Sequence, residues 1–267
     1  MSKTLGSLLF VGQRVIGRKS SFGIRFVSTV PGRSQFTMTG AKVQDPLQEA
    51  SMEEECILVD DNDQVIGSAS KRACHLVNSD GSLLLHRAFS VFAFNAAGQL
   101  LVQKRSQFKV TFPLLWANTC CSHPLNLPQE IKGESGARVA AQRRLGLELG
   151  VPADVAAPER MHFLTKVHYQ APSPQISTQR KGPVWGEHEI DYILILRGLE
   201  KEHLLPNQNE VAETHFLGRS DLLDFLNENK DSLTPWFSLI AHTLLPLWWD
   251  QLGNLQQVDQ QNLIHRF

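Results

Sequence analysis

The segment from Leu83 to Phe94 restricts the possible folds more than any other part of this 267-residue chain. From Ala88 to Phe94 nearly every residue is apolar, so neither face of a strand formed there can be left to water. Such a strand is expected in a middle layer, covered on both sides. The turn at Asn95–Gly98 and the apolar run after it, Gln99–Lys104, predict that this strand opens a hairpin.

Two further segments predict helices. Over Gly136–Leu149, Ala and Leu recur every four residues, and Gly150 stands where a helix ends. Thr234 and Pro235 have the cap-then-proline order that opens a helix, and a single last helix carrying three tryptophans is expected after them.

Other strands are predicted wherever an apolar run lies between turn residues: Cys56–Asp60, Val65–Gly67, Met161–Tyr169 and Glu189–Arg197. Between the last two, the residues from Gln170 to Val184 are polar and rich in Pro, Ser and Gln, which predicts a long flexible loop.

The composition excludes several classes of protein. The chain has 42% hydrophobic residues, 20% charged residues and a net charge of −1, a globular profile that gives no reason to expect nucleic acid as a partner. Its four cysteines do not form a disulfide pattern, which favours a reducing compartment. The most apolar stretch, Pro235–Trp249, is shorter than the roughly 20 residues that span a bilayer. We therefore expect no membrane partner.

The first 45 residues differ from the rest of the chain. No acidic residue precedes Asp45, whereas basic residues are interspersed with Ser and Thr. This composition is typical of an organelle transit peptide, which would be disordered and outside the folded domain. A plastid is the favoured destination, with the mitochondrion or the cytosol as alternatives, and a basic tail with no targeting role is the competing interpretation. The folded domain is then residues 46–267.

The stretch Asn118–Pro124 places a thiol two positions before an imidazole. In a strand or strand end, alternation would point Cys121 and His123 to the same face. One of them could be a reactive thiolate and the other a metal ligand. The alternative is two buried thiols beside a core histidine.

A second pattern suggests a metal site. Glu187 and Glu189 lie two positions apart in the approach to a strand, so they share a face and His188 points away. Carboxylates on one face repel each other unless a proton or a cation lies between them. Three histidines could add nitrogen ligands: His75, His86 and His123. Such a set suits zinc or manganese better than calcium, although each histidine alone is also explained as a hydrogen-bonded core or surface residue.

Basic residues near the strand ends and the helix suggest anion binding: Lys71, Arg105, Lys109 and Arg144. Several charge-assisted bonds from such groups could hold a diphosphate, although solvated surface charge explains each of them singly. Arg144 and Glu148 are one helical turn apart, and as a surface ion pair they would contribute only about 0.2–0.5 kcal/mol.

From Cys56 onward the chain resembles type I isopentenyl-diphosphate isomerase, a family of the Nudix-like superfamily. The resemblance rests on six stretches that follow in order through the domain: CHL at Cys74, LLHRAFSVF at Leu84, TFPLLWANTCCSHP at Thr111, AAQRRLGLELG at Ala140, WGEHEIDYIL at Trp185 and TPWF at Thr234. It implies an α/β fold, a Nudix-type α/β/α sandwich with a central mixed sheet and a C-terminal helix that closes the site.

The resemblance also implies a role for each matching residue. It places a divalent ion, zinc, manganese or magnesium, on five ligands: His75, His86, His123, Glu187 and Glu189. It places Mg²⁺ on Glu148, near the residues that would bind the substrate diphosphate: Lys71, Arg105, Lys109, Ser122 and Arg144. It implies that Cys121 and Glu189 are catalytic, that Tyr169 assists Glu189, and that Trp236 faces the hydrocarbon tail.

The implied reaction interconverts isopentenyl diphosphate and dimethylallyl diphosphate in isoprenoid biosynthesis, in a protein expected to be a monomer. Protonating an alkene creates a tertiary carbocation, so the chemistry needs an acid on one face, a base on the other, and exclusion of water. We assign Glu189 as the acid for the terminal carbon and the Cys121 thiolate as the base for the carbon nearer the diphosphate. Trp236 would offer its π face to the cation.

Two departures bear on this interpretation. Where Nudix pyrophosphohydrolases carry further glutamates on the helix, this chain has Arg144 and Leu147, and only Glu148 remains. The segment Ala171–Val184 is longer than the family suggests. A Nudix pyrophosphohydrolase is the first alternative. A zinc-stabilised interaction module is the second, and it is disfavoured because carboxylates are unusual in structural zinc sites.

Overall fold

The structure is a computed structural model that describes residues 46–173 and 184–267. The predicted transit peptide, residues 1–45, lies outside the described residues, as do residues 174–183 of the predicted loop. Within the described ranges, no helix is both long enough and apolar enough to cross a membrane.

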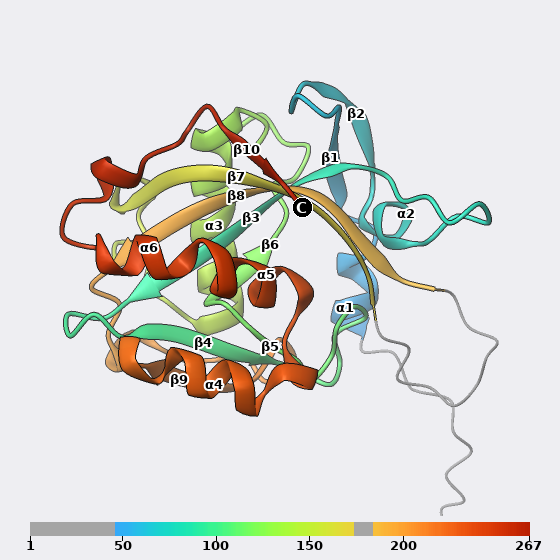
Figure 1. Ribbon diagram of the computed structural model, residues 1–267. Coiled ribbons are helices and arrows are strands. Elements are labelled where there is room, and N and C mark those ends of the chain that lie inside the picture. The colour runs from blue at the N-terminus through green and yellow to red at the C-terminus, as the bar shows by residue number, and fades with distance from the viewer. Residues whose placement is uncertain (1–45, 174–183) are drawn as a thin grey trace, which may run out of the picture. The chain divides into compact units, whose positions relative to one another are not determined.

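Short helices and strands follow each other along the described chain (Figure 1). The helices are α1 (Pro46–Ser51), α2 (Lys71–His75), α3 (Gly133–Leu149), α4 (Leu222–Glu228), α5 (Pro235–Thr243) and α6 (Leu245–Asp250). The strands are β1 (Glu55–Val59), β2 (Val65–Ser70), β3 (His86–Phe94), β4 (Leu100–Arg105), β5 (Trp116–Ala117), β6 (Cys120–Ser122), β7 (Met161–Pro172), β8 (Gly186–Arg197), β9 (Val211–Leu217) and β10 (Ile264–Arg266).

One mixed sheet contains all ten strands of the described residues. Its main path runs β10-β7-β8-β3-β1-β2, with β4 and β6 also paired to β3, and β5 and β9 paired to β4. The pairs β3–β8 and β10–β7 are parallel. The remaining pairs are antiparallel, among them the long β7–β8 pair. The mixed sheet between helices that the resemblance implied is confirmed.

Strand β3 is buried along its whole length and separates two apolar cores. Phe92 and Phe94 contribute to the core that includes residues of α4, α5 and α6, whereas Phe89 and Val91 contribute to the core that includes α3. This division follows from the alternation of side chains along a strand. Figure 1 shows α3 on one side of the sheet and α5 and α6 on the other. The predicted position of this strand between two layers is confirmed.

The hairpin predicted after β3 is present only at its turn. β3 and β4 pair at Phe94 and Leu100, and β4 then pairs with β5 and β9 instead. β3 pairs with β8 along its whole length, with β6 over Phe89–Val91 and with β1 at His86. The hairpin is confirmed at its turn. That β4 continues beside β5 and β9 could not be predicted, because an apolar pattern identifies a strand and its faces but not all of its neighbours.

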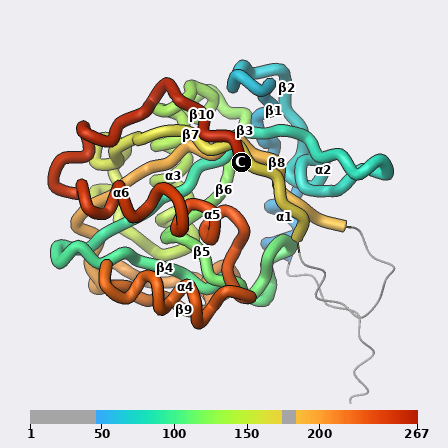
Figure 2. Tube along the Cα trace, in the orientation of Figure 1, coloured from blue at the N-terminus to red at the C-terminus, as the bar shows by residue number. Residues whose placement is uncertain are grey.

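The loop predicted between the two long strands is shorter than expected. β7 continues to Pro172 and β8 begins at Gly186, with these two residues opposite each other in the antiparallel pair. Figure 2 shows the two strands running together along their length. The Pro and Ser residues of this segment therefore did not end β7 where the sequence suggested.

The single last helix that was predicted is two helices. α5 ends at Thr243 and α6 begins at Leu245, with Pro246 in its first turn. Proline lacks an N–H and clashes with the preceding turn of a continuous helix, but it is tolerated where a new helix starts. Trp236 is therefore on α5, while Trp248 and Trp249 are on α6.

Candidate active site

Five potential metal ligands come together from four separate elements. His75 is the last residue of α2, His86 is the first residue of β3, and His123 follows β6 directly. Glu187 and Glu189 lie on β8. One ligand atom from each of the five lies within 4.8 Å of the others, and all five residues are buried. The structure thus brings together all five residues predicted for this ion, whereas Glu148, predicted for Mg²⁺, lies outside the cluster.

Local structure explains how these residues meet. The side chain of Ser70 accepts a hydrogen bond of 3.2 Å from the backbone N–H of Ala73, which caps the start of α2 and fixes the turn that ends at His75. The parallel pairing of β3 and β8 places His86 opposite Glu189. Because side chains alternate along β8, Glu187 faces the same side as Glu189.

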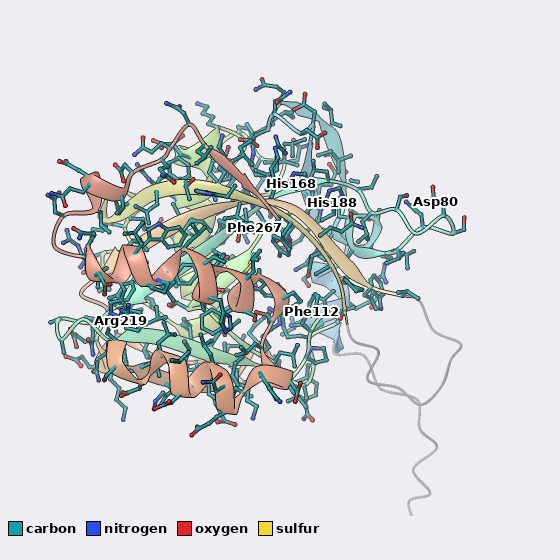
Figure 3. All side chains as sticks on the ribbon, in the orientation of Figure 1. Asp80, Phe112, His168, His188, Arg219 and Phe267 are labelled. Carbon is teal, nitrogen blue, oxygen red and sulfur yellow. The ribbon has the colours of Figure 1, made fainter. Side chains whose placement is uncertain are left out.

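His188 points to the other side, as predicted. Its Nδ1 lies 3.1 Å from the carbonyl oxygen of Leu83, and its Nε2 lies 3.0 Å from Nε2 of His168. The rings of His168 and His188 are stacked with their centroids 5.2 Å apart (Figure 3). This histidine pair therefore belongs to the face of β8 that is turned away from the five ligands.

Hydrogen bonds fix which ring nitrogens can bind a cation. The Nδ1 atoms of His75 and His86 lie 2.6 Å and 2.9 Å from the carbonyl oxygens of Lys71 and Leu84. A carbonyl only accepts, so each Nδ1 carries a proton, and Nε2 is the nitrogen that the neutral form of each ring would offer to a cation. Nε2 of His75 lies 2.7 Å from a Glu187 oxygen, and neither atom has a hydrogen-bond partner within the described chain. A divalent cation fits between such donors.

The charges of the cluster are strongly coupled. Burial and the adjacent charge of Glu189 raise the pKa of Glu187 well above its ordinary value. For Glu189 burial acts in the same direction, but the hydrogen bond with His123 and the adjacent charge of His86 hold its pKa well below the ordinary value. Against the effect of burial, Glu189 also raises the pKa of His86 to about 9. A cation on these ligands would stabilise both carboxylates in the ionised form.

A pocket with about 440 Å³ of empty space, including its opening to solvent, adjoins this cluster. Both predicted catalytic residues, Cys121 and Glu189, line it, together with His123 and Glu187. Cys121 and His123 therefore share a face, as the alternation along the CCSH stretch predicted. The remaining lining residues include the predicted Lys71, Arg105, Lys109, Tyr169 and Trp236.

Two aromatic residues form part of the pocket wall. The hydroxyl of Tyr169 donates a hydrogen bond of 2.5 Å to Oε2 of Glu189, as expected for a residue that assists this carboxyl group. The indole N–H of Trp236 donates to Oδ1 of Asn118 at 3.0 Å, and its ring packs edge-on against Phe112. The hydrogen bond fixes the orientation of the indole beside the pocket.

Cys121 is half-buried, and its thiol lies near anionic side chains. Burial and the nearby carboxyl groups of Asp191 and Glu189 raise its pKa well above the ordinary value. Directly opposite Cys121 in the β3–β6 pair lies Ser90, whose hydroxyl donates a hydrogen bond of 2.7 Å to Asp191. The protein's own groups therefore favour a protonated Cys121 thiol and an ionised Glu189 carboxylate.

Five predicted residues do not line the pocket: His75 and His86 of the ligand cluster, and Ser122, Arg144 and Glu148. Ser122 alternates to the other face of β6 and is opposite Phe89. Arg144 and Glu148 form an ion pair of 2.5 Å in which both side chains are at least 96% buried. Their interpretation as a surface pair was wrong, because this stripe of α3 faces the loop before β9 and not solvent.

Two acidic residues of the site were missed. Asp191 has the same two-residue spacing from Glu189 as Glu189 has from Glu187, so the alternation rule could have found it. Glu210 accepts hydrogen bonds from Lys109 at 2.6 Å and Arg144 at 3.3 Å. It lies 101 residues from Lys109 in the sequence, and no local pattern connects the two.

Residues 84–237 match the NUDIX domain family. This match covers more than half of the chain and includes the central strands, α3 and the start of α5. The sheet between helices and the family match together define a NUDIX domain protein.

The chain is also similar to curated proteins over most of its length. It is 44% identical over 227 residues to isopentenyl-diphosphate Delta-isomerase 1 of Bos taurus, covering 83% of this chain and 96% of that protein. It is 43% identical over 256 residues to isopentenyl-diphosphate Delta-isomerase I of Clarkia breweri, covering 91% and 86%. The isopentenyl-diphosphate delta-isomerase of Phaffia rhodozyma is 47% identical over 206 residues, covering 75% and 78%. The chain belongs to the isopentenyl-diphosphate delta-isomerase family.

Proposed function

We propose that this protein interconverts isopentenyl diphosphate and dimethylallyl diphosphate by adding a proton to one carbon and removing a proton from another. One observation supports the proposal most strongly: Cys121 and Glu189 line the same pocket, with the five-ligand cluster and several cationic side chains around it. A thiol and a carboxyl group in one enclosed space can act as acid and base on the same small substrate.

In the direction that forms dimethylallyl diphosphate, Glu189 gives a proton to the terminal carbon of the alkene. Cys121, as the thiolate, then removes a proton from the carbon nearer the diphosphate, and the double bond forms there. Tyr169 stays hydrogen-bonded to Glu189 and orients its carboxyl group. In the reverse direction the Cys121 thiol is the acid and the Glu189 carboxylate is the base. Burial favours the protonated thiol that this direction requires.

Metal binding is part of the proposal. His75, His86, His123, Glu187 and Glu189 would hold a divalent ion, for which zinc and manganese suit the nitrogen and oxygen donors best. Glu148 would hold Mg²⁺ near the diphosphate. When bound, these ions would supply positive charge that neutralises the carboxylates and the substrate head group.

The charged head of the substrate would lie against the cationic side chains. Lys71, Arg105 and Lys109 line the pocket, and Arg144 contacts the same acidic residue as Lys109. At the other end Trp236 would face the carbocation, a contact worth roughly 2 kcal/mol when it is desolvated. The alkene would then lie between Cys121 and Glu189.

The test is to incubate the purified protein with isopentenyl diphosphate and Mg²⁺ and to measure both dimethylallyl diphosphate and inorganic phosphate. The proposal expects the isomer and no phosphate. Release of phosphate or pyrophosphate without isomerisation would identify a pyrophosphohydrolase instead.

We also propose that residues 1–45 direct import into an organelle, with a plastid favoured. The support is compositional, since basic and hydroxyl side chains occur there and no acidic residue precedes Asp45. A fluorescent protein fused to residues 1–50 is expected to enter the organelle, and diffuse cytosolic fluorescence would contradict this.

A further inference from the structure

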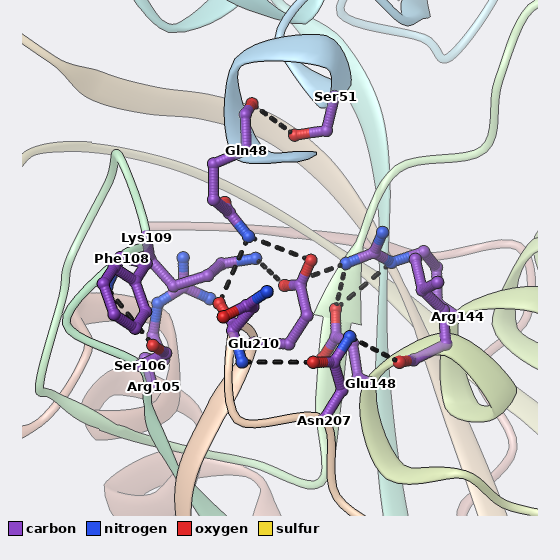
Figure 4. Close-up of polar contacts among 12 residues, drawn as sticks. Gln48, Ser51, Arg105, Ser106, Phe108, Lys109, Arg144, Glu148, Asn207 and Glu210 are labelled. Carbon is purple, nitrogen blue, oxygen red and sulfur yellow. Dashed lines mark hydrogen bonds and ion pairs between the residues drawn. The ribbon is translucent and has the colours of Figure 1, made fainter. Parts of the chain in front are cut away.

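Glu210 is a buried carboxylate immediately before β9, and it connects three separate parts of the chain. Its Oε2 accepts hydrogen bonds from Nζ of Lys109 at 2.6 Å and from Nη2 of Arg144 at 3.3 Å. Its Oε1 accepts from Nε2 of Gln48 at 3.0 Å (Figure 4). The loop after β4, helix α3 and helix α1 therefore meet at this side chain.

The backbone holds Glu210 in place independently of these side chains. Its N–H donates to the carbonyl oxygen of Asn207, and its own carbonyl oxygen accepts from the N–H of Ser106, both at 2.9 Å. Asn207 is held in turn by a hydrogen bond of 2.9 Å from its N–H to the carbonyl oxygen of Glu148. The carboxylate is therefore fixed relative to both α3 and the loop that carries Lys109.

Both cations keep donors available after contacting Glu210. The ammonium group of Lys109 has three N–H bonds, and Glu210 is its one hydrogen-bond partner in the described residues. Arg144 uses Nε and Nη2 on Glu148 and Glu210, while its Nη1 has no bond to the described chain. Lys109 also lines the pocket. Oriented cations with unused donors match the several acceptor oxygens of a diphosphate.

We propose that Glu210 is a positioning residue for the substrate diphosphate, because it holds Lys109 and Arg144 in the arrangement that binds this group. The inference rests on the proposed function for the identity of the substrate. In this role Glu210 does not contact the reacting carbons and acts through Lys109 and Arg144. Gln48 supports the role because it fixes the second oxygen of the same carboxylate.

The energetics of burial agree with this role. An ammonium group removed from water is costly unless a counter-charge accompanies it. Burial lowers the pKa of Lys109, and the charge of Glu210 opposes that effect. Glu210 thus keeps a buried lysine charged and in one position before the diphosphate arrives.

A positioning role and a purely electrostatic role of Glu210 predict opposite effects on the affinity for an anion when its carboxylate is removed. If charge alone mattered, removing one negative group beside the cations would tighten the binding of an anion. If Glu210 orients the cations, the same change weakens binding, because Lys109 and Arg144 must be ordered by the ligand itself.

The experiment compares the full-length protein with Glu210→Gln, Glu210→Asp and Glu213→Gln. Glu213 lies on β9 and forms an exposed ion pair with Lys104, so its substitution is a matched control on the same strand. The readouts are kcat and KM for isopentenyl diphosphate, and the Kd of inorganic pyrophosphate with Mg²⁺ measured by calorimetry.

For Glu210→Gln we expect KM and the pyrophosphate Kd to rise about tenfold while kcat changes less than about threefold. Glu210→Asp should recover part of the loss, and Glu213→Gln should match the wild type. An unchanged or tighter pyrophosphate Kd in Glu210→Gln would overturn the inference. Pyrophosphate binding is measured without turnover, so a wild-type protein that fails to isomerise would count against the proposed function and leave this test in force.

A second variant covers the case in which Glu210→Gln does not fold. Gln48→Leu removes the amide that holds Oε1 of Glu210 and keeps a side chain of similar size on α1. Its pyrophosphate Kd should rise about threefold with an unchanged circular dichroism spectrum. A folded Gln48→Leu protein with wild-type Kd would contradict a role for this contact in positioning the carboxylate.

Discussion

At the scale of single residues, the two adjacent cysteines have different surroundings. Cys121 lines the pocket, whereas Cys120 is fully buried in the core beside α3, with its sulfur 3.6 Å from Oε2 of Glu148. Adjacent residues of a strand point to opposite faces, so only one of the two thiols can reach the substrate.

Cys121→Ala is therefore expected to reduce turnover at least 1000-fold, roughly the contribution of an essential acid–base group, with pyrophosphate binding within about threefold of the wild type. Cys120→Ala is expected to keep most of the activity and to lose about 1 kcal/mol of unfolding free energy to a small cavity. Steady-state kinetics and chemical denaturation measure the two effects. Equal losses of turnover in both variants would contradict the assignment of the catalytic thiol.

Trp236 combines an aromatic face with one hydrogen bond. Its indole donates to Asn118, whose amide group donates to the carbonyl oxygens of Val91 and Cys120. Trp236→Phe keeps the π face and leaves the oxygen of Asn118 without this donor, at a cost of about 1–3 kcal/mol of stability. We expect Trp236→Phe to keep more activity than Trp236→Leu when kcat is compared. Equal kcat values for the two variants would remove the argument that the ring stabilises a cation.

At the scale of elements, the start of α3 depends on a close backbone approach. A Cβ atom on Gly136 would lie 2.0 Å from the carbonyl oxygen of Glu130, a position that backbone atoms cannot vacate easily. A Cβ on Gly146, in the same helix, would lie 3.7 Å from the carbonyl oxygen of Val151, which is an ordinary contact.

The same substitution should therefore have opposite effects at these two positions of α3. Gly136→Ala is expected to lower the unfolding free energy by more than about 3 kcal/mol through backbone displacement. Gly146→Ala should raise it by about 0.5–1 kcal/mol because alanine favours a helix. Denaturant unfolding of both variants measures this difference, and equal destabilisation would show that helical glycine itself, not crowding, sets the effect.

The ion pairs of Glu210 between α3 and the loop before β9 lead us to expect that the free energy of unfolding falls at acidic pH. Although burial opposes it, Lys109 and Arg144 lower the pKa of Glu210 from 4.5 to about 2. A carboxyl group whose pKa is lower in the folded state than in the unfolded state stabilises the fold at any pH above its unfolded-state pKa. This stabilisation is lost as the pH falls through its folded-state pKa. Between pH 4.5 and 2 the wild type should lose roughly 3 kcal/mol more than Glu210→Gln. Parallel stability curves for the two proteins over this range would contradict the ion-pair network.

The elements themselves could be predicted from the sequence to different degrees. The strand over Ala88–Phe94 and the helix that ends before Gly150 follow from apolar periodicity and a left-handed glycine, and both are confirmed. Helix α1 and strand β10 were not predicted, because each is short and is stabilised by distant partners. The packing of β10 against β7 joins residues about 100 positions apart, a relation that no local pattern contains.

At the scale of the whole molecule, the cluster of five potential metal ligands depends on the arrangement of α2, β3, β6 and β8. The sequence identified the five ligands as candidates, and the resemblance to a family grouped them. Residue types alone left each histidine open to a structural role, because the distances between ligands up to 114 positions apart along the chain come from the fold. Glu210 was missed for the same reason.

Removing divalent metal with a chelator is expected to abolish isomerisation and lower the melting temperature while leaving the fold intact. The two apolar cores on either side of the sheet supply most of the stability and do not depend on the cluster. Elemental analysis measures the loss of metal, and circular dichroism measures the fold. Complete unfolding on chelation would instead support a structural zinc site.

We propose that Glu189 adds a proton to the terminal carbon of the alkene and that Cys121 removes one from the carbon nearer the diphosphate. The decisive experiment is to incubate the full-length protein with isopentenyl diphosphate in deuterated water and to follow label in both isomers by mass spectrometry and NMR. We predict that deuterium from the solvent enters both isopentenyl and dimethylallyl diphosphate with the wild type, and enters neither with Cys121→Ala. Isomerisation without deuterium uptake, or equal uptake with Cys121→Ala, would contradict this account.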